Sequence, residues 1–435
     1  MTKSKKIKQT LKQTREKRKL QIPKVFQLKL QNLSRADLQT LERLFLEAKW
    51  FHNYIIADVE NRLNSESEKL REVEIKTPRG FEKRKLKILG SQIKQGLIKR
   101  IRNNLTTLRK AKEKGLKVGK LKFKSDFRSI PLKQYGMTYK IDFERNRVKI
   151  QGIKKKFRVL GLHQIPENAE ITNAYLIKKP TGYYLYVVCY LWKEEALKGI
   201  EEKQFSIPVG IDLGVKDQVS LTTGEKIRWY IPETKRLKRL QRTLARRKKG
   251  SKNYLKAKSL IQKEWEYVKN RREDVKNKVM SYLKRFSFIA FQDDSIKGWH
   301  EGLFGKQVQN TGIGGITARL RRLATLIPVE FVDRYEPTTQ TCSKCGFRYK
   351  LELSQRIFEC PRCGLRIDRD LNSAWNILKL GLEQLAQKNK ALAYRLMSAL
   401  PVDRGEVKPV EREASAPCFV PGVSSLVEAG SPSLQ

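Results

Sequence analysis

The sequence predicts an α+β protein of several domains, and three observations support this prediction. Apolar residues recur at helical spacing from about Ser34 to Leu108. Short β-branched and aromatic segments separated by turns fill residues 120–200. Two Cys-x-x-Cys pairs follow within residues 342–363, among alternating strand-like and helix-like patterns. The 435 residues are 39% hydrophobic, which is enough to build several cores and excludes wholesale disorder.

The charge of the chain indicates its class of partner. The chain carries 93 Lys and Arg residues against 45 Asp and Glu residues, a net charge of +48 that opposes compact folding. Because Lys and Arg release counterions from phosphates, a long polyanion is the expected partner, and an ordinary metabolic enzyme is not. No run of 18 apolar residues and no apolar stretch behind the basic N-terminus occurs, so we expect no membrane span, no membrane partner and no signal peptide. Four of the six cysteines form two Cys-x-x-Cys pairs, which indicate metal binding in a reducing cytosol, so we expect a cytoplasmic, nucleoid-associated protein.

The first half of the chain is predicted to join helices to a β unit. A basic N-terminal arm leads into a strand at Ile22–Leu30. Ser34, with Asp37 three residues later, is typical of a helix start, and the helices that follow are interrupted near Thr77–Gly80. The next strands predict a small barrel, whose basic and aromatic side chains suit stacking on bases and pairing with phosphates.

Residues 233–285 are predicted to form one long basic helix or a helical hairpin broken at Gly250. Between Lys235 and Arg285 there are 20 basic and 4 acidic residues, an imbalance that a solvated helix face does not need. We therefore predict that this segment lines a groove for nucleic-acid phosphates. The residues expected to bind nucleic acid are Arg236, Lys238, Arg239, Arg242, Arg246, Arg247, Lys248, Lys249 and Lys252.

Buried strands and helices are predicted on both sides of the basic segment. Strands are expected within 205–230, where two strands flank a tight turn, and at 286–294 and 327–337. Helices are expected at about 315–326 and 368–388. After about Val402 the chain is rich in Pro, Ser, Gly and Glu, so a disordered tail is predicted.

The cysteine pairs predict a zinc ribbon. Each Cys-x-x-Cys presents two sulfurs from one tight turn, and two such turns complete the tetrahedron that zinc prefers. A glycine follows the second cysteine of each pair, as such turns require. With four thiolates and no open position implied, the zinc is expected to be structural. The four ligands are Cys342, Cys345, Cys360 and Cys363.

Three carboxylates point to metal-dependent chemistry. Asp212 interrupts an apolar strand, which is a costly place for a charge without a role. Asp368 and Asp370 open the helix DRDLN, where Asp alone is often only a cap. A first strand with Asp and a late helix that starts with Asp are together the plan of an RNase H-like nuclease. Such sites hold two Mg²⁺ ions that activate water and stabilise the leaving oxygen.

Four motifs make the chain similar to the TnpB family. They are GIDLGVK, the basic segment 237–258, TTQTCSKCG at 338–346 and DRDLNSAWNIL at 368–378, and the resemblance runs in order from about residue 20 to 388. TnpB proteins are transposon-encoded, RNA-guided DNA nucleases similar to compact type V CRISPR effectors. The resemblance implies a guide RNA, target double-stranded DNA and its displaced single strand as partners, with Zn²⁺ and Mg²⁺ as cofactors.

The resemblance also implies a domain order. A helical recognition lobe is inserted into a wedge-like β-barrel, and a RuvC-type RNase H-like α/β domain with an inserted zinc ribbon follows. The implied boundaries are 1–30 for the basic arm and first wedge strand, 31–115 for the recognition lobe, 116–203 for the wedge barrel, 204–336 for the first RuvC part, 337–367 for the zinc ribbon, 368–400 for the last RuvC part, and 401–435 for the tail.

The resemblance implies Asp212 and Asp370 as the first and last catalytic carboxylates, with Asp368 a residue of the helix start. The middle position departs from the family, because Gln292 stands where a Glu is usual and an amide cannot replace a carboxylate on Mg²⁺. Glu336 is the preferred substitute, since the strand before it is expected beside the strand of Gln292. Asp293 is expected to face away and Asp294 to face the site if the strand continues.

Two functional interpretations follow, and a third is disfavoured. The first is an RNA-guided, Mg²⁺-dependent DNA endonuclease that cuts with Asp212, Glu336 and Asp370. In the second, the loss of the usual Glu leaves an RNA-guided DNA-binding protein that acts as a repressor. A DNA strand transferase shares the RNase H-like plan, but the zinc ribbon and basic hairpin favour the guided nuclease. The choice between monomer and dimer stays open.

Overall fold

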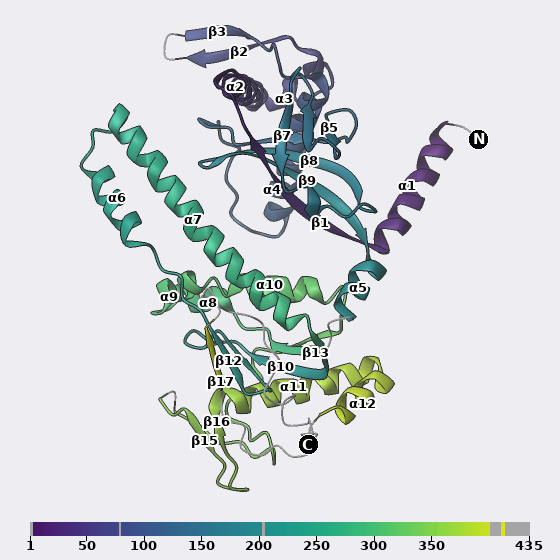
Figure 1. The fold of residues 1–435 in the computed structure, drawn as a ribbon, viewed down its shortest axis with the longest axis vertical. Coiled ribbons are helices and arrows are strands. Elements are labelled where there is room, and N and C mark those ends of the chain that lie inside the picture. The colour runs from purple at the N-terminus through teal and green to yellow at the C-terminus, as the bar shows by residue number, and fades with distance from the viewer. Residues whose placement is uncertain (1–2, 78–79, 202–204, 353, 401–409, 414–435) are drawn as a thin grey trace, which may run out of the picture. The chain divides into compact units, whose positions relative to one another are not determined.

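The computed structural model describes residues 3–77, 80–201, 205–352, 354–400 and 410–413 (Figure 1). The chain divides into two compact units, residues 1–193 and 194–435. Each unit combines helices with a sheet and has hydrophobic cores of its own. The predicted α+β class is therefore confirmed.

A seven-stranded antiparallel sheet frames the first unit, in the order β4-β8-β9-β1-β7-β6-β5. Its strands are β1 (Gln21–Gln31), β4 (Ser129–Leu132), β5 (Tyr139–Asp142), β6 (Arg147–Ile150), β7 (Lys156–Leu160), β8 (Glu170–Lys179) and β9 (Gly182–Trp192). The edge strands β4 and β5 do not pair with each other in the described part of the chain; an isolated bridge joins Tyr135, in the segment between them, to Tyr139 of β5. A sheet with two edges thus stands where a small barrel was predicted.

The helices of the first unit are inserted between β1 and β4. Ser34 and Asp37 form the predicted capping box, because each side chain accepts a hydrogen bond from the backbone N–H of the other. At the interruption predicted near Thr77–Gly80 the structure has two antiparallel strands, in which Thr77 pairs with Gly80. The inserted elements are α2 (Arg35–Ala57), α3 (Val59–Arg62), the 3₁₀ turn η1 (Glu66–Lys69), β2 (Glu72–Thr77), β3 (Gly80–Lys85) and α4 (Ser91–Glu113). Two further elements lie outside this insertion: α1 (Lys3–Lys19) precedes β1, and η2 (Leu162–Gln164) follows β7.

One core serves both the helices and the sheet of this unit. Leu28 of β1, Leu44 of α2 and Ile93 of α4 are fully buried in the same cluster. The buried carboxylate of Glu47 accepts hydrogen bonds from three successive backbone N–H groups, at residues 87–89, and so fixes the segment that leads into α4. The predicted helical and β segments consequently fold together.

His52 should make the first unit sensitive to acid. It packs on Phe127, with ring centroids 5.5 Å apart, and burial together with the charges of Lys124 and Arg100 lowers its pKa from 6.5 to about 4. As the pH falls, the unfolded chain therefore binds the proton at a higher pH than the folded chain does. The contribution of His52 to the stability of the folded state is thus fully present above pH 6.5 and is lost as the pH falls toward 4. We expect a loss of roughly 2–3 kcal/mol.

Urea unfolding of wild type and His52→Gln at pH 4 and pH 7 checks this. In His52→Gln, the free energy of unfolding of the first unit should differ much less between pH 7 and pH 4 than it does in wild type. In His163→Gln, which changes an exposed residue, the difference between the two pH values should be the same as in wild type. An unchanged pH dependence in His52→Gln would contradict the expectation.

A six-stranded mixed sheet frames the second unit, in the order β14-β13-β10-β11-β12-β17. β10, β13 and β14 are parallel, β10, β11 and β12 are antiparallel neighbours, and β17 lies parallel to β12. The strands are β10 (Phe205–Asp212), β11 (Val219–Leu221), β12 (Glu225–Arg228), β13 (Phe286–Gln292), β14 (Val329–Val332) and β17 (Val410–Glu413). Gln292 pairs with Val332, so the predicted neighbourhood of these two strands is confirmed.

The basic segment is a helical hairpin, the second of the two predicted forms. α6 (Lys235–Ala245) and α7 (Lys252–Leu283) are separated by Gly250, whose φ of 85° permits the reversal. The other helices are α5 (Lys193–Glu201) at the boundary of the units, α8 (Ile296–Glu301), α9 (Gly305–Thr311), α10 (Gly314–Leu323), α11 (Arg369–Lys388) and α12 (Lys390–Ser398).

Helix α11, predicted at 368–388, lies directly against the sheet (Figure 1). A Cβ added at Gly210 of β10 would lie 2.1 Å from the carbonyl oxygen of Ala374, and one at Gly381 would lie 2.4 Å from Cβ of Ala290. Only glycine permits such an approach at these two contacts. The helix that carries Asp370 is thus held at a fixed distance from the strand that carries Asp212.

Two predictions on this unit need correction. The strand predicted at 327–337 ends at Val332, because Asp333 forms a turn in which its carboxylate accepts from Tyr335 N at 2.8 Å and its carbonyl from Glu336 N at 3.2 Å. In the predicted tail, Val410–Glu413 are not disordered but form β17, since the outer edge of β12 offers unpaired backbone groups. Residues 401–409 and 414–435 lie outside the described residues.

Candidate functional site

The four predicted zinc ligands come together. The sulfur atoms of the four cysteines all lie within 4.8 Å of one another, with Sγ of Cys342 3.6 Å from that of Cys363 and Sγ of Cys345 3.5 Å from that of Cys360. A tetrahedral Zn²⁺ with Zn–S bonds near 2.3 Å needs sulfurs about 3.8 Å apart. The donor set and its spacing therefore fit a structural zinc.

Local turns build the cysteine site. Gly346 and Gly364 have φ of 76° and 70°, which confirms the predicted role of the glycine after each pair. The second pair lies within the hairpin of β15 (Ile357–Glu359) and β16 (Arg366–Asp368). Although burial opposes it, the backbone N–H groups of Cys363 and Arg362 lower the pKa of Cys360 to about 7, which favours the thiolate that binds metal.

Asparagines of α11 connect the cysteine site to the carboxylates. Asn372 accepts a hydrogen bond from Ser343 N at 2.9 Å and donates one to the carbonyl of Thr341 at 2.7 Å. Asn376 donates to the carbonyls of Thr338 and Thr341 at 2.8 and 2.6 Å. Both asparagines are buried, so the first cysteine turn is fixed to the helix that begins with Asp370.

Asp212 ends β10 beneath this helix. Its carboxylate lies 3.2 Å from Ser373 Oγ, which in turn lies 3.0 Å from Thr338 Oγ1, and the single Ser373 hydroxyl proton is donated to one of these two acceptors at a time. Burial, reinforced by the negative charges of Asp370 and Asp294, raises the pKa of Asp212 well above its usual range. Carboxylates that repel one another in this way are the ligands that a divalent cation brings together.

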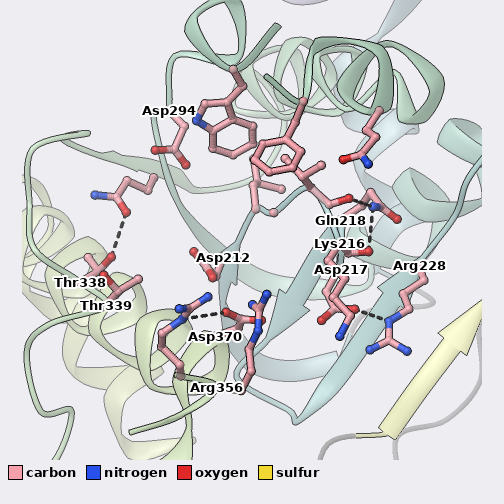
Figure 2. A pocket seen from close by; sticks show the side chains of 18 of the residues that line it. Asp212, Lys216, Asp217, Gln218, Arg228, Asp294, Thr338, Thr339, Arg356 and Asp370 are labelled. Carbon is pink, nitrogen blue, oxygen red and sulfur yellow. Dashed lines mark hydrogen bonds and ion pairs between the residues drawn. The ribbon is translucent and has the colours of Figure 1, made fainter. Parts of the chain in front are cut away.

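Asp368 has the helix-start position that was predicted for it. Asp368 caps α11, because its carboxylate accepts hydrogen bonds from the N–H groups of Asp370 and Leu371 at 3.0 and 3.1 Å. The cap turns the Asp370 side chain toward Asp212. In Figure 2, Asp212 lies between Asp294 on one side and Asp370 on the other.

Lys226 is a member of the site that sequence reasoning missed. Its ammonium lies 2.8 Å from a carboxylate oxygen of Asp368, 3.2 Å from Asp370 Oδ2 and 3.6 Å from Asp217 Oδ2. Only 6% of the residue is exposed. Burial lowers the pKa of Lys226, but the hydrogen bond to Asp368 and the charges of the carboxylates outweigh it and raise the pKa overall. Lys226 lies in a four-residue strand, two positions after the turn at Gly224. The sequence around it contains no motif that could have indicated this role.

Gln292 lines the same cavity, but the hydrogen bonds of its amide go to the segment after β14. Its amide nitrogen donates to the backbone carbonyls of Asp333 and Glu336, both at 2.9 Å, and its amide oxygen accepts from Thr338 Oγ1 at 2.9 Å. The side chain thus fixes both ends of the turn after β14. Glu336 itself is exposed and lines the same cavity as Asp212.

The two aspartates after β13 point in different directions. Asp293 forms an ion pair with Arg321 of α10. Asp294 lines the cavity, and burial together with the charge of Asp293 raises its pKa to about 6. Asp212 thus has a second partly buried carboxylate near it besides Asp370, although β13 ends before Asp294.

The carboxylates lie in a cavity of about 1270 Å³ (Figure 2). Besides Asp212, Asp294, Glu336 and Asp370, it is lined by cationic side chains and by aromatic ones, of which Trp229 is buried and the others are exposed or half-buried. The cationic residues are Lys216, Arg228, Arg334, Arg356 and Arg369, and the aromatic ones are Trp229, Tyr230, Trp299 and Phe304. Cations that neutralise phosphates, aromatic faces for bases and carboxylates for metal ions are thus found in one cavity.

The nine residues predicted to bind nucleic acid all lie on α6, in the turn around Gly250 and at the start of α7. Each is exposed, whereas Leu237 on the same helix is buried. In the described part of the chain, Arg236 lies 3.6 Å from Glu264, so one of the nine charges is partly compensated. The described helices include none that is both long and apolar enough to cross a membrane.

Comparisons with known proteins give two family models. Residues 189–286 match the OrfB/IS605 model, described as "Probable transposase", and residues 322–377 match the model described as "Cas12f1-like, TNB domain". The first model spans α6, α7 and Asp212, and the second spans the four cysteines and Asp370.

Curated relatives carry matching names. A Streptomyces pristinaespiralis protein named "Putative RNA-guided DNA endonuclease" is 30% identical over 227 residues, which are 50% of this chain and 55% of the relative. InsQ of Escherichia coli K12, which has the same description, is 30% identical over 206 residues, 41% of this chain and 50% of the relative. The chain spans about half the length of these curated relatives. A solved Cas12f1–sgRNA–target DNA complex aligns over 79% of this chain and 83% of its own, with 16% identity and a TM-score of 0.46.

Proposed function

Because this chain belongs to the TnpB (OrfB/IS605) transposase family, we propose that it is an RNA-guided DNA endonuclease. The proposal takes guide RNA, double-stranded target DNA and the displaced single strand as partners. The cut is assigned to the carboxylate cavity of the second unit, and the basic α6–α7 hairpin is assigned to phosphate binding.

The convergence of Asp212 and Asp370 is the observation on which this proposal rests. The two carboxylates come from elements 158 positions apart in sequence, yet the charge of Asp370 acts directly on Asp212. Their oxygen donors fit Mg²⁺, which, when bound by such carboxylates, activates water and stabilises the leaving oxygen of a phosphodiester. Ser373 orients Asp212, the Asp368 cap orients Asp370, and the surrounding arginines hold the phosphate backbone.

Glu336 is our choice for the third carboxylate. Gln292 stabilises the turn that carries Glu336, so the residue at the usual position still contributes to the site by orienting its substitute. Asp294 is the alternative, since it is partly buried and its charge acts on Asp212. In either case a carboxylate from the loop after β13 or β14 would complete the set.

A cleavage assay tests the proposed function. The purified chain with its guide RNA should convert matched target DNA to nicked or broken product when Mg²⁺ is present, and leave mismatched DNA intact. Intact matched DNA, together with a retained gel shift, would exclude the nuclease and favour the second candidate, an RNA-guided DNA-binding repressor. The observation that favours this second candidate is the neutral amide of Gln292 at the position of the usual Glu.

Two variants should identify the third carboxylate. We expect Glu336→Gln to slow cutting by about 100-fold or more, because one metal ligand is lost, and Asp294→Asn to slow it by less than about 10-fold. Single-turnover cleavage rates at saturating guide RNA measure both effects, and Glu352→Gln, at an exposed site outside the cavity, serves as the control. The reverse order of effects would assign the role to Asp294.

A further inference from the structure

We propose that Lys226 is the internal counter-ion of the carboxylate site and holds Asp368 and Asp370 in place when no divalent cation is bound. This inference rests on the proposed function, because it presumes that Asp212 and Asp370 bind a metal ion. It assigns a positioning role to a residue that lies on β12, outside the motifs that define the site.

The burial of Lys226 shows that its charge needs compensation. The side chain is 8% exposed, and a lysine at such a place is costly unless carboxylates surround it. Three carboxylates do so at 2.8, 3.2 and 3.6 Å, and they come from two separate parts of the chain, the loop after β10 and the start of α11. Lys226 therefore joins β12 to both.

Lys226 acts on the site through the cap of α11. The Asp368 carboxylate that receives the ammonium also accepts the N–H groups of Asp370 and Leu371, so the lysine, the cap and the first helical turn form one connected unit. The ammonium lies 3.2 Å from Oδ2 of Asp370, while Oδ1 lies 3.6 Å from Arg369 Nε. The lysine thereby sets the orientation of the Asp370 carboxylate.

The charge balance indicates why a counter-ion is needed here. Asp212, Asp294 and Asp370 line the same cavity, so like negative charges are gathered there. Lys226 is placed at the Asp370 end of this group and offsets part of the repulsion without a metal ion. Loss of its charge should therefore destabilise the metal-free protein and increase the stabilisation that a divalent cation brings.

Thermal unfolding of the full chain in EDTA and in saturating Mg²⁺ tests this inference. We expect Lys226→Met to lower the Tm in EDTA by about 5 °C or more and to increase the Mg²⁺-dependent rise in Tm at least about twofold over wild type. Lys226→Arg keeps the charge and should respond to Mg²⁺ as wild type does. Lys388→Met removes the 2.6 Å ion pair with Glu330 at the other end of α11, and should leave the Mg²⁺-dependent rise unchanged.

The outcomes separate this inference from the proposed function. If Lys226→Met lowers the Tm equally in EDTA and in Mg²⁺, or shrinks the Mg²⁺-dependent rise, Lys226 is a structural ion pair only and the inference is overturned. If wild type gains stability from Mg²⁺ and Asp370→Asn loses that gain, the metal site stands whatever Lys226 does. If neither wild type nor Lys226→Met responds to Mg²⁺, both the metal site and the counter-ion role are wrong.

Discussion

Asp370→Asn is expected to reduce guided cleavage by about 1000-fold or more, because an amide lowers the charge that holds the metal ions in the cavity. The substitution keeps the size of the side chain, and the Asp368 cap does not depend on the Asp370 side chain, so α11 should stay folded. Binding of guide RNA and target DNA should change little. Cleavage rates and gel shifts on the same preparations measure the two properties.

The matched control is Asp274→Asn. Asp274 lies on α7, is exposed and pairs with Lys278 at 3.1 Å, so its loss removes one carboxylate from the same unit without touching the cavity. Cleavage within about twofold of wild type is expected for this variant. An Asp370→Asn protein that still cuts at the wild-type rate would show that the carboxylate cavity is not the nuclease site.

Cys360→Ser is expected to release zinc and to unfold the segment around the four cysteines. Structural zinc contributes about 10 kcal/mol or more to the folding of isolated zinc domains, and this segment has only a small buried cluster of its own. Because Asn372 and Asn376 connect the first cysteine turn to α11, cleavage should also fall. Zinc content per chain, measured by atomic emission, and the thermal unfolding profile check the two parts.

Cys189→Ala separates loss of zinc from loss of a buried cysteine. Cys189 is fully buried in β9 of the first unit, so its replacement should lower the stability of that unit and leave the zinc content unchanged. A Cys360→Ser protein that retains one zinc per chain would contradict the assignment of the four ligands.

Local signals account for what the sequence predicted well. The capping box at Ser34, the hairpin at Gly250, the cysteine turns and the Asp368 cap each depend on residues within four positions, so a linear pattern contains them. Hydrophobic runs located β10, β13 and α11 in the same way. Local patterns alone could not predict that Asp212 and Asp370 lie close together. That prediction also required the RNase H-like order of strands and helices.

Non-local contacts account for the rest. Lys226 acquires its role from carboxylates at positions 217, 368 and 370, and no local pattern joins them. The extent of β14 was overestimated because the Asp333 turn competes with the strand through a side-chain hydrogen bond that apolar periodicity does not report. The strand β17 depends on an unpaired edge more than 180 positions earlier in the sequence.

The hydrogen bonds of Gln292 also limit which substitutions this position can accept. In Gln292→Glu the new carboxylate would face the carbonyl oxygens of Asp333 and Glu336, two acceptors with no proton to offer. Restoration of the usual family residue by one substitution is therefore disfavoured until the turn beside it has been rebuilt.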